Sequence, residues 1–205
     1  MCVISTERRN PFFAKANGCQ GDRDDSSTRW SQTPKSAYNS RMSITIQPLE
    51  PHHIPEVKHL ILSVARNIFD WERPLDELVE LADENHDFYD IDDVGAHYFA
   101  NQGMFLVALD DGRVIGSGAV RRMSARSCEL KRMWLAEAYH GQGIGYRVMQ
   151  ELFGFARWAG YTRMELNTSL QQERAIQFYL RLGFEFMEMD EDEEMDGIVF
   201  MEMEL

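Results

Sequence analysis

Three alternating glycines between a predicted strand and a predicted helix constrain the fold more than any other feature of this chain. They lie in the run His140-Gly-Gln-Gly-Ile-Gly145. Because glycine has no Cβ atom, the backbone can turn tightly here and direct successive N–H groups toward one point. The helix that begins there adds the positive end of its dipole. The loop is therefore expected to bind a pyrophosphate group.

The spacing of the loop excludes two common phosphate-binding loops. A Rossmann fingerprint requires Gly or Ala at position 146, where this chain has Tyr146, and it belongs near the start of a βαβ unit. A Walker loop contains Gly-Lys-Ser or Gly-Lys-Thr, which this chain lacks. Taken alone, the glycine run leaves a structural turn without a ligand as the alternative.

The hydrophobic pattern predicts one α/β domain over residues 43–205. Helical spacing of apolar residues indicates helices at 57–70, 75–82, 143–159 and 173–182, the last two ending at Gly160 and Gly183. Alternating or apolar runs indicate strands at 44–46, 104–109, 114–120, 129–135, 164–167, 184–189 and 198–205. Asp110-Asp111-Gly112 predicts a tight hairpin turn. An acidic loop is expected after the second helix.

Residues 1–42 are rich in Ser, Arg, Asn, Asp and Gly and have no helical or strand period, so we expect them to be a disordered tail. Met42 opens a stretch that looks like a natural protein start, which leaves a targeting segment or an over-long start as alternatives. No run approaches the roughly 18 apolar residues that span a bilayer, and no secretory signal is evident. A cytoplasmic location is expected.

Charge and metal-ligating residues limit the partners. The net charge is −13, and removing the 7 basic and 4 acidic residues of positions 1–42 leaves −16 for the remainder. Such a domain repels nucleic acid and anionic membranes and favours cationic partners. The 3 cysteines and 6 histidines show no metal-ligand spacing, so no metal is expected. Cys128 is interpreted as a packed thiol, with a nucleophile as the alternative.

Three segments together resemble the GNAT superfamily of acyl-CoA N-acetyltransferases. They are Glu129-Leu-Lys-Arg-Met-Trp-Leu135, the glycine loop, and Ala175-Ile-Gln-Phe-Tyr-Leu-Arg-Leu-Gly-Phe184, in that order and spacing. The resemblance covers residues 43–205 and is most specific from 129 to 184. It implies a mixed, mostly antiparallel, twisted sheet of about seven strands with helices on both faces. The sheet would be splayed between its fourth and fifth strands, with the pantetheine arm of the coenzyme in the splay.

The resemblance also implies a binding site for acetyl-CoA as co-substrate. Backbone groups of Met133, Trp134 and Leu135 would contact the pantetheine arm and the acetyl carbonyl, and Asn167 and Phe178 would flank the arm. The pyrophosphate would be held by Gly141, Gln142, Gly143, Ile144, Gly145 and Tyr146, and His140 and Gln172 would also belong to the coenzyme site. The family usually has Arg or Gln where this chain has His140, and often Asn where it has Gln172. Both replacements keep hydrogen-bonding capacity.

Two side chains are the catalytic candidates. An alkylammonium group, with a pKa of about 10.4, is protonated at neutral pH, so a base must supply the neutral amine. Glu129 lies eleven residues before His140, the spacing of the catalytic glutamate in the histone acetyltransferase branch that this chain resembles; an exposed strand residue is the alternative. Tyr179 lies in a Phe-Tyr-x-x-x-Gly-Phe pattern. The resemblance implies that it protonates the leaving thiolate, and packing is the alternative.

The expected acceptor is a primary amine of a small cationic molecule or a peptide. In the family, the acceptor enters over the first two helices and the loop between the last two strands. Both regions are acidic here, with Asp70, Glu72, Asp76, Glu77, Glu80, Asp83, Glu84, Asp87, Asp90, Asp92 and Asp93 in the first and Asp190, Glu191, Asp192, Glu193, Glu194 and Asp196 in the second. These carboxylates would attract a cation, or they form only a solvated surface. Phe69, Trp71, Phe88, Tyr89, Tyr98 and Phe99 either line an acceptor pocket or pack in the core.

Two alternative hypotheses for the function remain. The domain could bind acetyl-CoA as a catalytically silent regulatory module, or the glycine turn could bind no coenzyme at all. The resemblance also implies a possible homodimer.

Overall fold

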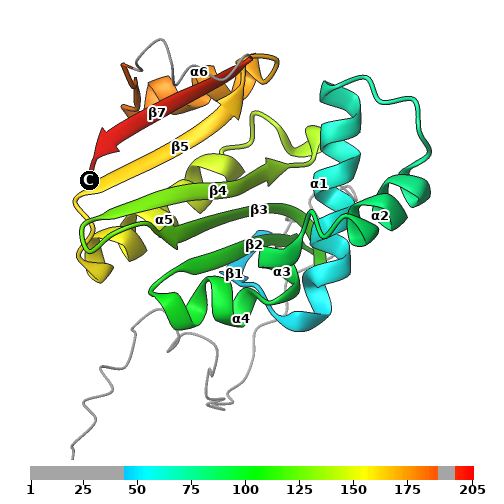
Figure 1. Ribbon diagram of the computed structural model, residues 1–205, viewed down its shortest axis with the longest axis horizontal. Helices are drawn as coiled ribbons and strands as arrows, with labels where there is room; N and C mark the ends of the chain where they lie inside the picture. The colour runs from blue at the N-terminus through cyan, green and yellow to red at the C-terminus, as the bar shows by residue number, and fades with distance from the viewer. Residues whose placement is uncertain (1–43, 189–196) are drawn as a thin grey trace, which may run out of the picture. The chain divides into compact units, whose positions relative to one another are not determined.

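Seven strands form one sheet in the computed structural model (Figure 1), which describes residues 44–188 and 197–205. They are β1 (Ile44–Pro48), β2 (Met104–Asp110), β3 (Arg113–Arg122), β4 (Ser127–Leu135), β5 (Arg163–Ser169), β6 (Glu185–Phe186) and β7 (Ile198–Glu204), in the spatial order β1-β2-β3-β4-β5-β7-β6. The expected tail at 1–42 and the second acidic run, at 190–196, lie outside the described residues.

All neighbouring strands are antiparallel except β4 and β5, which are parallel. These two strands pair only from Ser127 with Arg163 to Glu129 with Glu165. Because β4 continues to Leu135 and β5 to Ser169, the strands part beyond Glu129 and leave one edge of β4 open. The predicted mixed, mostly antiparallel sheet, splayed in the middle, is confirmed.

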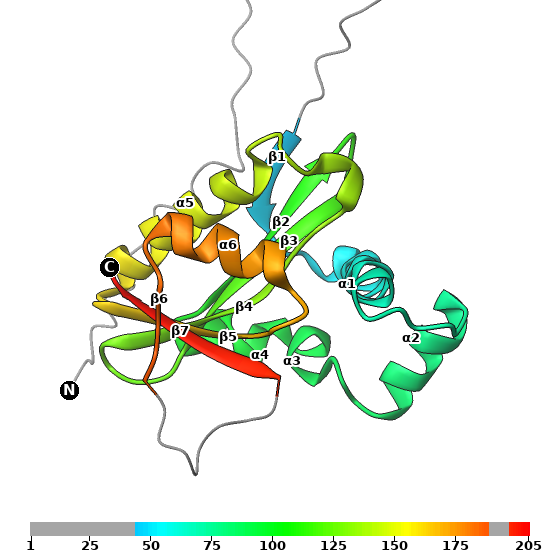
Figure 2. The ribbon, with the colours of Figure 1, turned by 90° about the horizontal axis from the view of Figure 1, so that it is seen from above.

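Helices cover both faces of the sheet. They are α1 (Ile54–Ile68), α2 (Leu75–Glu84), α3 (Tyr89–Asp92), α4 (Val94–His97), α5 (Ile144–Ala159) and α6 (Glu173–Leu182), with short 3-10 turns η2 (Pro51–His53), η3 (Phe99–Asn101) and η4 (Glu137–Tyr139). Figure 2 shows α5 and α6 on one face and α1 to α4 on the other. No helix in the described part of the chain is long and apolar enough to cross a membrane.

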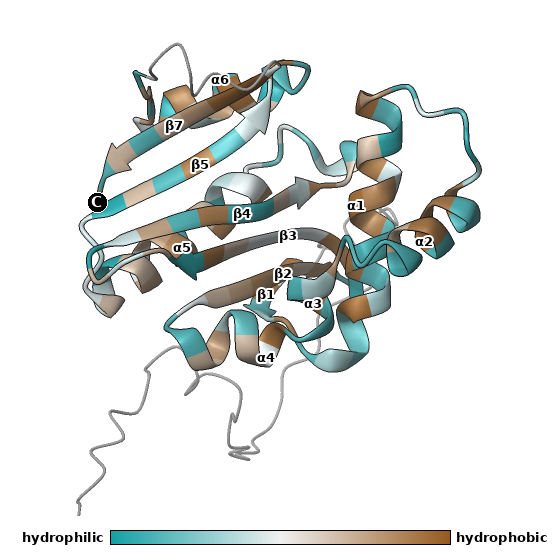
Figure 3. Cartoon of the chain, in the orientation of Figure 1, coloured by the Kyte–Doolittle hydropathy of each residue, from teal (hydrophilic) through white to brown (hydrophobic). Residues whose placement is uncertain are grey.

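Strand β2 runs through the core. All of its residues except the last are buried, and it is brown along most of its length in Figure 3. On one face Phe105 and Val107 pack with Val57 and Ile61 of α1. On the other face α5 buries an apolar stripe that includes Val148, Leu152 and Phe153. Burial on both faces explains why this strand reads as a continuous apolar run.

Two predictions from the sequence differ from the structure. The expected acidic loop after the second helix contains α3, α4 and η3, because Ile91, Val94 and Tyr98 turn into the core. The strand expected at 184–189 is limited to Glu185 and Phe186, because Phe184 packs as a buried core residue beside Phe153. Its last residue, at 189, lies outside the described residues. The interpretation of Cys128 as a packed thiol is confirmed: it is fully buried, and burial raises the pKa of its thiol to about 12.

Candidate active site

A cavity of about 1340 Å³ opens at the end of the sheet where β4 leaves β5. Its walls come from one side of α1, the end of β4, the loop that leads into α5, and one side of α6. Twelve of the fifteen residues predicted for the site line it: Met133, Trp134, Leu135, His140, Gly141, Gly143, Ile144, Gly145, Tyr146, Gln172, Phe178 and Tyr179. Glu129, Gln142 and Asn167 are not among the lining residues.

The glycine loop forms the positively polarised wall of the cavity. Gly141 and Gly143 have φ of +76° and +75°, in the left-handed region that disfavours side chains. Gly143 is the N-cap of α5, and no side chain caps the helix there. The first N–H groups of α5 are thus left for a ligand, and the helix dipole favours an anion at this point.

The polar side chains of the loop turn back onto the protein. The Nε2 atom of Gln142 donates to the carbonyl oxygen of Ala138 at 3.1 Å. Nε2 of His140 lies 3.1 Å from the carbonyl oxygen of Leu135, and its buried Nδ1 has no partner among the described residues. These two side chains brace the loop against the end of β4 and η4.

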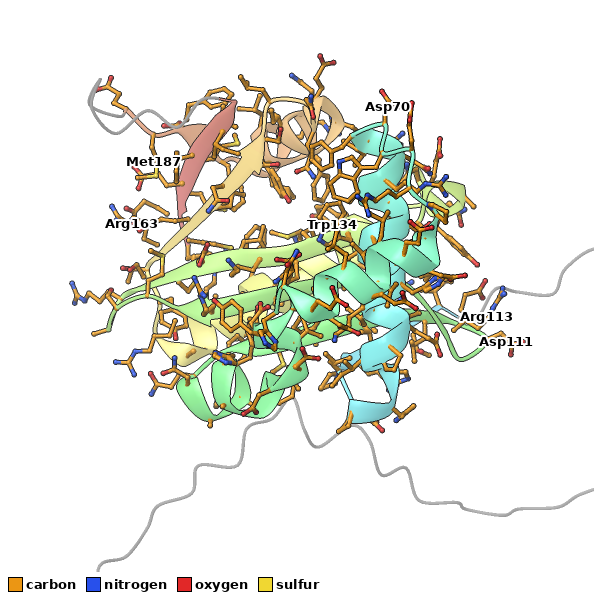
Figure 4. The ribbon with its side chains drawn as sticks, turned by 45° about the vertical axis from the view of Figure 1, so that its right-hand side comes forward. Asp70, Asp111, Arg113, Trp134, Arg163 and Met187 are labelled. Carbon is orange, nitrogen blue, oxygen red and sulfur yellow. The ribbon has the colours of Figure 1, made fainter. Side chains whose placement is uncertain are left out.

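The three segments of the sequence signature meet at Gly145. A Cβ atom added there would lie 3.6 Å from Cε of Met133 and 3.6 Å from Cζ of Phe178. The glycine loop, the end of β4 and α6 are therefore in contact around one point. Figure 4 shows Trp134 at the end of β4 beside α1.

The end of β4 carries a β-bulge. Ser117 pairs with Trp134 and Ala119 with Lys131, so Gly118 of β3 faces two residues of β4, Arg132 and Met133. Arg132 has φ of +53°, which is rare for a residue with a side chain. The bulge lies directly before the cavity-lining residues 133–135, whose edge toward β5 pairs with no strand among the described residues.

Tyr179 combines burial with access to the cavity. It is 6% exposed and lines the cavity, and its ring packs against Phe178 and Phe184 with centroids 5.7 Å away in each case. Burial raises the pKa of its hydroxyl well above the ordinary value. The phenol is therefore neutral and able to donate a hydrogen bond throughout the physiological pH range.

Glu129 lies at the point where β4 and β5 part, and its carboxylate is already occupied. Its Oε2 accepts from Nη2 of Arg121 at 2.6 Å, and its Oε1 lies 3.4 Å from Nζ of Lys131. Nδ2 of Asn167 reaches the same Oε1 at 3.5 Å. Glu129 is only 7% exposed, so it is a buried member of an ionic cluster and not an exposed strand residue.

Helix α1 contributes a polar stripe that the sequence analysis did not single out. Glu56, His59, Ser63 and Asn67 follow one another at helical spacing and line the cavity. The signal for this stripe was present in the sequence as polar residues at three- and four-residue intervals among the apolar positions of α1. Oε2 of Glu56 accepts from the backbone N–H of Val114 at 2.9 Å, whereas the side chains of the other three make no hydrogen bond within the described residues, so they face the cavity as available polar groups.

The acidic and aromatic residues of 70–99 that were expected at the acceptor entrance do not line the main cavity. None of the eleven carboxylates from Asp70 to Asp93 and none of the six aromatic residues named with them lines the main cavity. Asp90, Phe88 and Tyr98 are buried, and Lys58 bridges Asp83 and Asp92 at 2.7 and 2.6 Å. The described charges of the cavity wall are instead balanced, with Glu56, Glu137 and Glu173 against Arg113, Arg174 and Arg181.

Residues 44–188 and 197–205 bring no three His, Cys, Asp or Glu side chains together in a way that could hold a metal ion.

Comparison with known proteins agrees with this geometry. The model of the acetyltransferase (GNAT) family matches residues 65–184. An uncharacterised N-acetyltransferase of Mycobacterium tuberculosis is 33% identical over 79 residues, which are 38% of this chain and 51% of that protein. N-acetyltransferase 8 of Mus musculus is 30% identical over 102 residues, which are 47% of this chain and 45% of that protein. The chain thus spans about half the length of the curated relatives it matches.

Solved structures share the fold at low sequence identity. The PaiA N-acetyltransferase of Thermoplasma acidophilum, solved in complex with coenzyme A, superposes with a TM-score of 0.65 at 18% identity, over 80% of this chain and 100% of that one. A GNAT-family acetyltransferase of Staphylococcus aureus gives a TM-score of 0.66 at 19% identity, over 79% and 99%.

Proposed function

Because the chain belongs to the GNAT family of acetyltransferases, we propose that it transfers an acetyl group from acetyl-CoA to a primary amine. The observation that carries the proposal is the single cavity that joins the N-terminus of α5 to the open edge of β4 and to Tyr179. An anion-binding helix end and an unpaired strand edge are the two features that a long phosphorylated thioester needs.

The residues present fit acetyl-CoA. The pyrophosphate would lie on Gly141 to Tyr146, where the N–H groups at the start of α5 have no capping side chain. The pantetheine arm would run along Met133 to Leu135, where β4 has left β5, with Phe178 beside it. The coenzyme A bound to the PaiA enzyme of the same fold supports this assignment.

The proposed reaction is a direct transfer. The neutral amine nitrogen attacks the thioester carbonyl carbon, so that a C–N bond forms and the C–S bond breaks. A backbone N–H at Trp134 or Leu135 would stabilise the charge that develops on the carbonyl oxygen. Tyr179 would donate its hydroxyl hydrogen to the leaving sulfur. The proton lost by the amine goes to a base, and the products are an amide and the thiol of coenzyme A.

Two side chains are candidates for the base. Glu129 has the spacing of a catalytic glutamate and lies where β4 and β5 part, but Arg121 and Lys131 already hold its two oxygens. His59 of α1 is exposed on the cavity wall, and imidazole is the ordinary general base near neutral pH. The sequence spacing favours Glu129, whereas the cavity lining favours His59.

A small cationic molecule or a peptide amine remains the proposed acceptor. The net charge of −16 that remains after residues 1–42 would attract a cation at long range. Close to the reacting atoms, the polar stripe of His59, Ser63 and Asn67 would contact the acceptor. Steering by the outer field predicts that kcat/KM for a polyamine falls as salt is added.

The experiment that tests the function measures thiol release from acetyl-CoA with the full chain and a panel of amines, beside thermal unfolding with and without the coenzyme. The proposal expects stabilisation by acetyl-CoA and thiol release that depends on an amine. Stabilisation without turnover on any amine would favour the silent regulatory module instead. No stabilisation and no turnover would contradict both.

A further inference from the structure

We propose that Asp90 is a positioning residue for acetyl transfer. Through Arg132 it would hold the bulge of β4 that sets the path of Met133 to Leu135. This inference rests on the proposed function only for its effect on turnover, since the tie between Asp90 and the bulge is a property of the protein alone.

The ion pair is two-pronged, and it joins a fully buried carboxylate to a partly buried guanidinium. Nη2 of Arg132 lies 2.6 Å from Oδ1 of Asp90, and Nε lies 3.2 Å from Oδ2. Asp90 is 0% exposed, and the hydroxyl of Tyr98, also 0% exposed, donates to Oδ2 at 2.5 Å. A paired fork of this kind fixes the direction of the guanidinium as well as its position.

Two further contacts fix the guanidinium in place. Nη2 of Arg132 also donates to the carbonyl oxygen of Asp87 at 3.0 Å, and its Cζ lies 5.2 Å from the centroid of the Phe88 ring. Asp87, Phe88 and Asp90, with Tyr98 behind Asp90, thus form a clamp around one arginine of β4, and all of these except Asp87 are buried.

Arg132 is one of five described non-glycine residues whose backbone lies in the left-handed region, and it is the one of these in β4. Its φ of +53° is maintained only where the surroundings enforce it. The clamp holds its side chain, while Oγ of Ser117 donates to its carbonyl oxygen at 2.7 Å. Gly118 leaves room on the neighbouring strand, because a Cβ atom there would lie 3.0 Å from Sδ of Met133. The contacts of the Arg132 side chain, the hydrogen bond to its carbonyl oxygen and the space beside Gly118 together favour one geometry of the bulge.

The geometry of Arg132 affects the cavity-lining residues that come after it in β4. Met133, Trp134 and Leu135 follow the bulge directly and line the cavity. A rotation at Arg132 would move the backbone groups proposed to contact the acetyl carbonyl, and displacements of about 1 Å at a reacting centre cost about 100-fold in rate. Asp90 itself does not line the cavity, so it acts through Arg132.

The test compares Asp90→Asn with a matched control, Lys58→Met. Lys58 also lies over Phe88 and pairs with carboxylates of the same region, Asp83 and Asp92, but it contacts no residue of β4 among the described contacts. Both variants lose an ion pair of the same region, although the carboxylates that pair with Lys58 are exposed, and only Asp90→Asn is expected to release the bulge. Three measurements are made on the full chain: amide hydrogen exchange at 133–135, the Kd of coenzyme A, and kcat with an amine that the wild type acetylates.

We expect Asp90→Asn to raise amide exchange at 133–135 by about 10-fold or more and to lower kcat by about 10- to 100-fold. The Kd of coenzyme A should rise by less than kcat falls, because the pyrophosphate site at Gly141 to Tyr146 is unchanged, although the pantetheine arm would also lie along Met133 to Leu135. Lys58→Met should lower Tm comparably and leave exchange at 133–135 and kcat within about twofold. Arg132→Lys keeps the charge but loses the fork, so it should give an intermediate exchange rate.

Equal losses of kcat in Asp90→Asn and Lys58→Met at equal loss of Tm would overturn the proposal, as would unchanged amide exchange in Asp90→Asn. If that variant does not fold, Tyr98→Phe and Arg132→Lys weaken the same clamp and give the same comparison. If the wild type acetylates no amine, the proposed function fails, and amide exchange still decides whether Asp90 holds the bulge.

Discussion

Arg121 holds the carboxylate of Glu129 with two hydrogen bonds to one oxygen, 2.6 Å from Nη2 and 3.2 Å from Nε. The contact joins β3 to β4 at the last position where β4 still pairs with β5. A proton taken from an amine would have to displace one of the contacts that this carboxylate already makes. These contacts therefore bear directly on whether Glu129 can act as the general base.

Glutamine variants of the two base candidates should give opposite results. The residue that takes the proton should lose about 100-fold or more in kcat when replaced, and the other should change kcat only a few-fold. His59→Gln and Glu129→Gln both keep a hydrogen-bonding group, and steady-state kinetics over pH 6 to 9 measures the difference. A large loss of kcat in His59→Gln beside a small loss in Glu129→Gln would identify the imidazole as the base. A similar small loss in both variants would show that solvent takes the proton.

Tyr179→Phe should lower kcat by about 100-fold with little change in the KM for acetyl-CoA, because the hydroxyl acts on the sulfur as charge develops there. Tm should stay close to that of the wild type, since this hydroxyl has no hydrogen-bond partner among the described residues. Burial raises the pKa of Tyr179, so the wild-type rate should show no alkaline loss from this group below pH 10. Tyr161→Phe is the matched control: it removes a hydroxyl that donates to Gln102 at 2.8 Å, away from the cavity. Equal kcat in the two variants would rule out the role of Tyr179.

Gly143→Ala should weaken coenzyme A binding by about 10-fold or more. Its φ of +75° places an alanine in strained backbone, at a cost of about 1 kcal/mol, and relaxing the strain would turn N–H groups away from the anion. Gly112→Ala places the same strain, at φ of +78°, in the hairpin between β2 and β3. Calorimetry with coenzyme A should separate the two variants, whereas thermal unfolding should not. Equal affinities would contradict a pyrophosphate site at this loop.

Asp90→Asn should lose stability above about pH 5 and approach the wild type in acid. Burial alone raises the pKa of the Asp90 carboxyl, but the hydrogen bonds and charge of Arg132 outweigh it and hold the pKa below 3.8. A lowered pKa in the folded state gives stability that is complete above the unfolded value and is lost as pH falls through the folded value. The difference in unfolding free energy should be about 3 kcal/mol at pH 7 and shrink below pH 3.8. Urea unfolding at pH 3 to 7 checks it, and a difference independent of pH would contradict the ion pair.

Local pattern was sufficient for the elements that form the coenzyme side of the cavity. The helix predicted at 143–159 matches α5 (Ile144–Ala159), and the one predicted at 173–182 has the bounds of α6. These helices are long, have regular apolar spacing and end at Gly160 and Gly183. A short stretch of sequence therefore contains the signals for where each helix begins, which face is apolar and where it ends. The glycine loop was predictable for the same reason.

The region of 83–103 was not predictable in this way. Helices α3 and α4 have four residues each, about one helical turn, so the apolar spacing of a helix does not repeat within them. Asp90 looks like one more member of an acidic run until Arg132, 42 residues later, reaches it. The sequence does not distinguish a buried aspartate from a solvated one. The difference depends on whether a cationic side chain from another strand lies beside it in the folded protein.

The sequence by itself determined the glycine loop and the order of the seven strands and of the helices α1, α2, α5 and α6, because each follows from short-range spacing. The site residues around Gly145 were predicted from the resemblance of three segments to the GNAT family. Tertiary structure alone decided which polar groups face the cavity: the His59 stripe of α1 lies in its wall, while Glu129 and Asp90 are held by arginines of β3 and β4. The physical reason is that the state of a charged side chain depends on what lies within a few ångströms of it. For these residues the partner comes from a different element, through strand register and helix packing that no local pattern records.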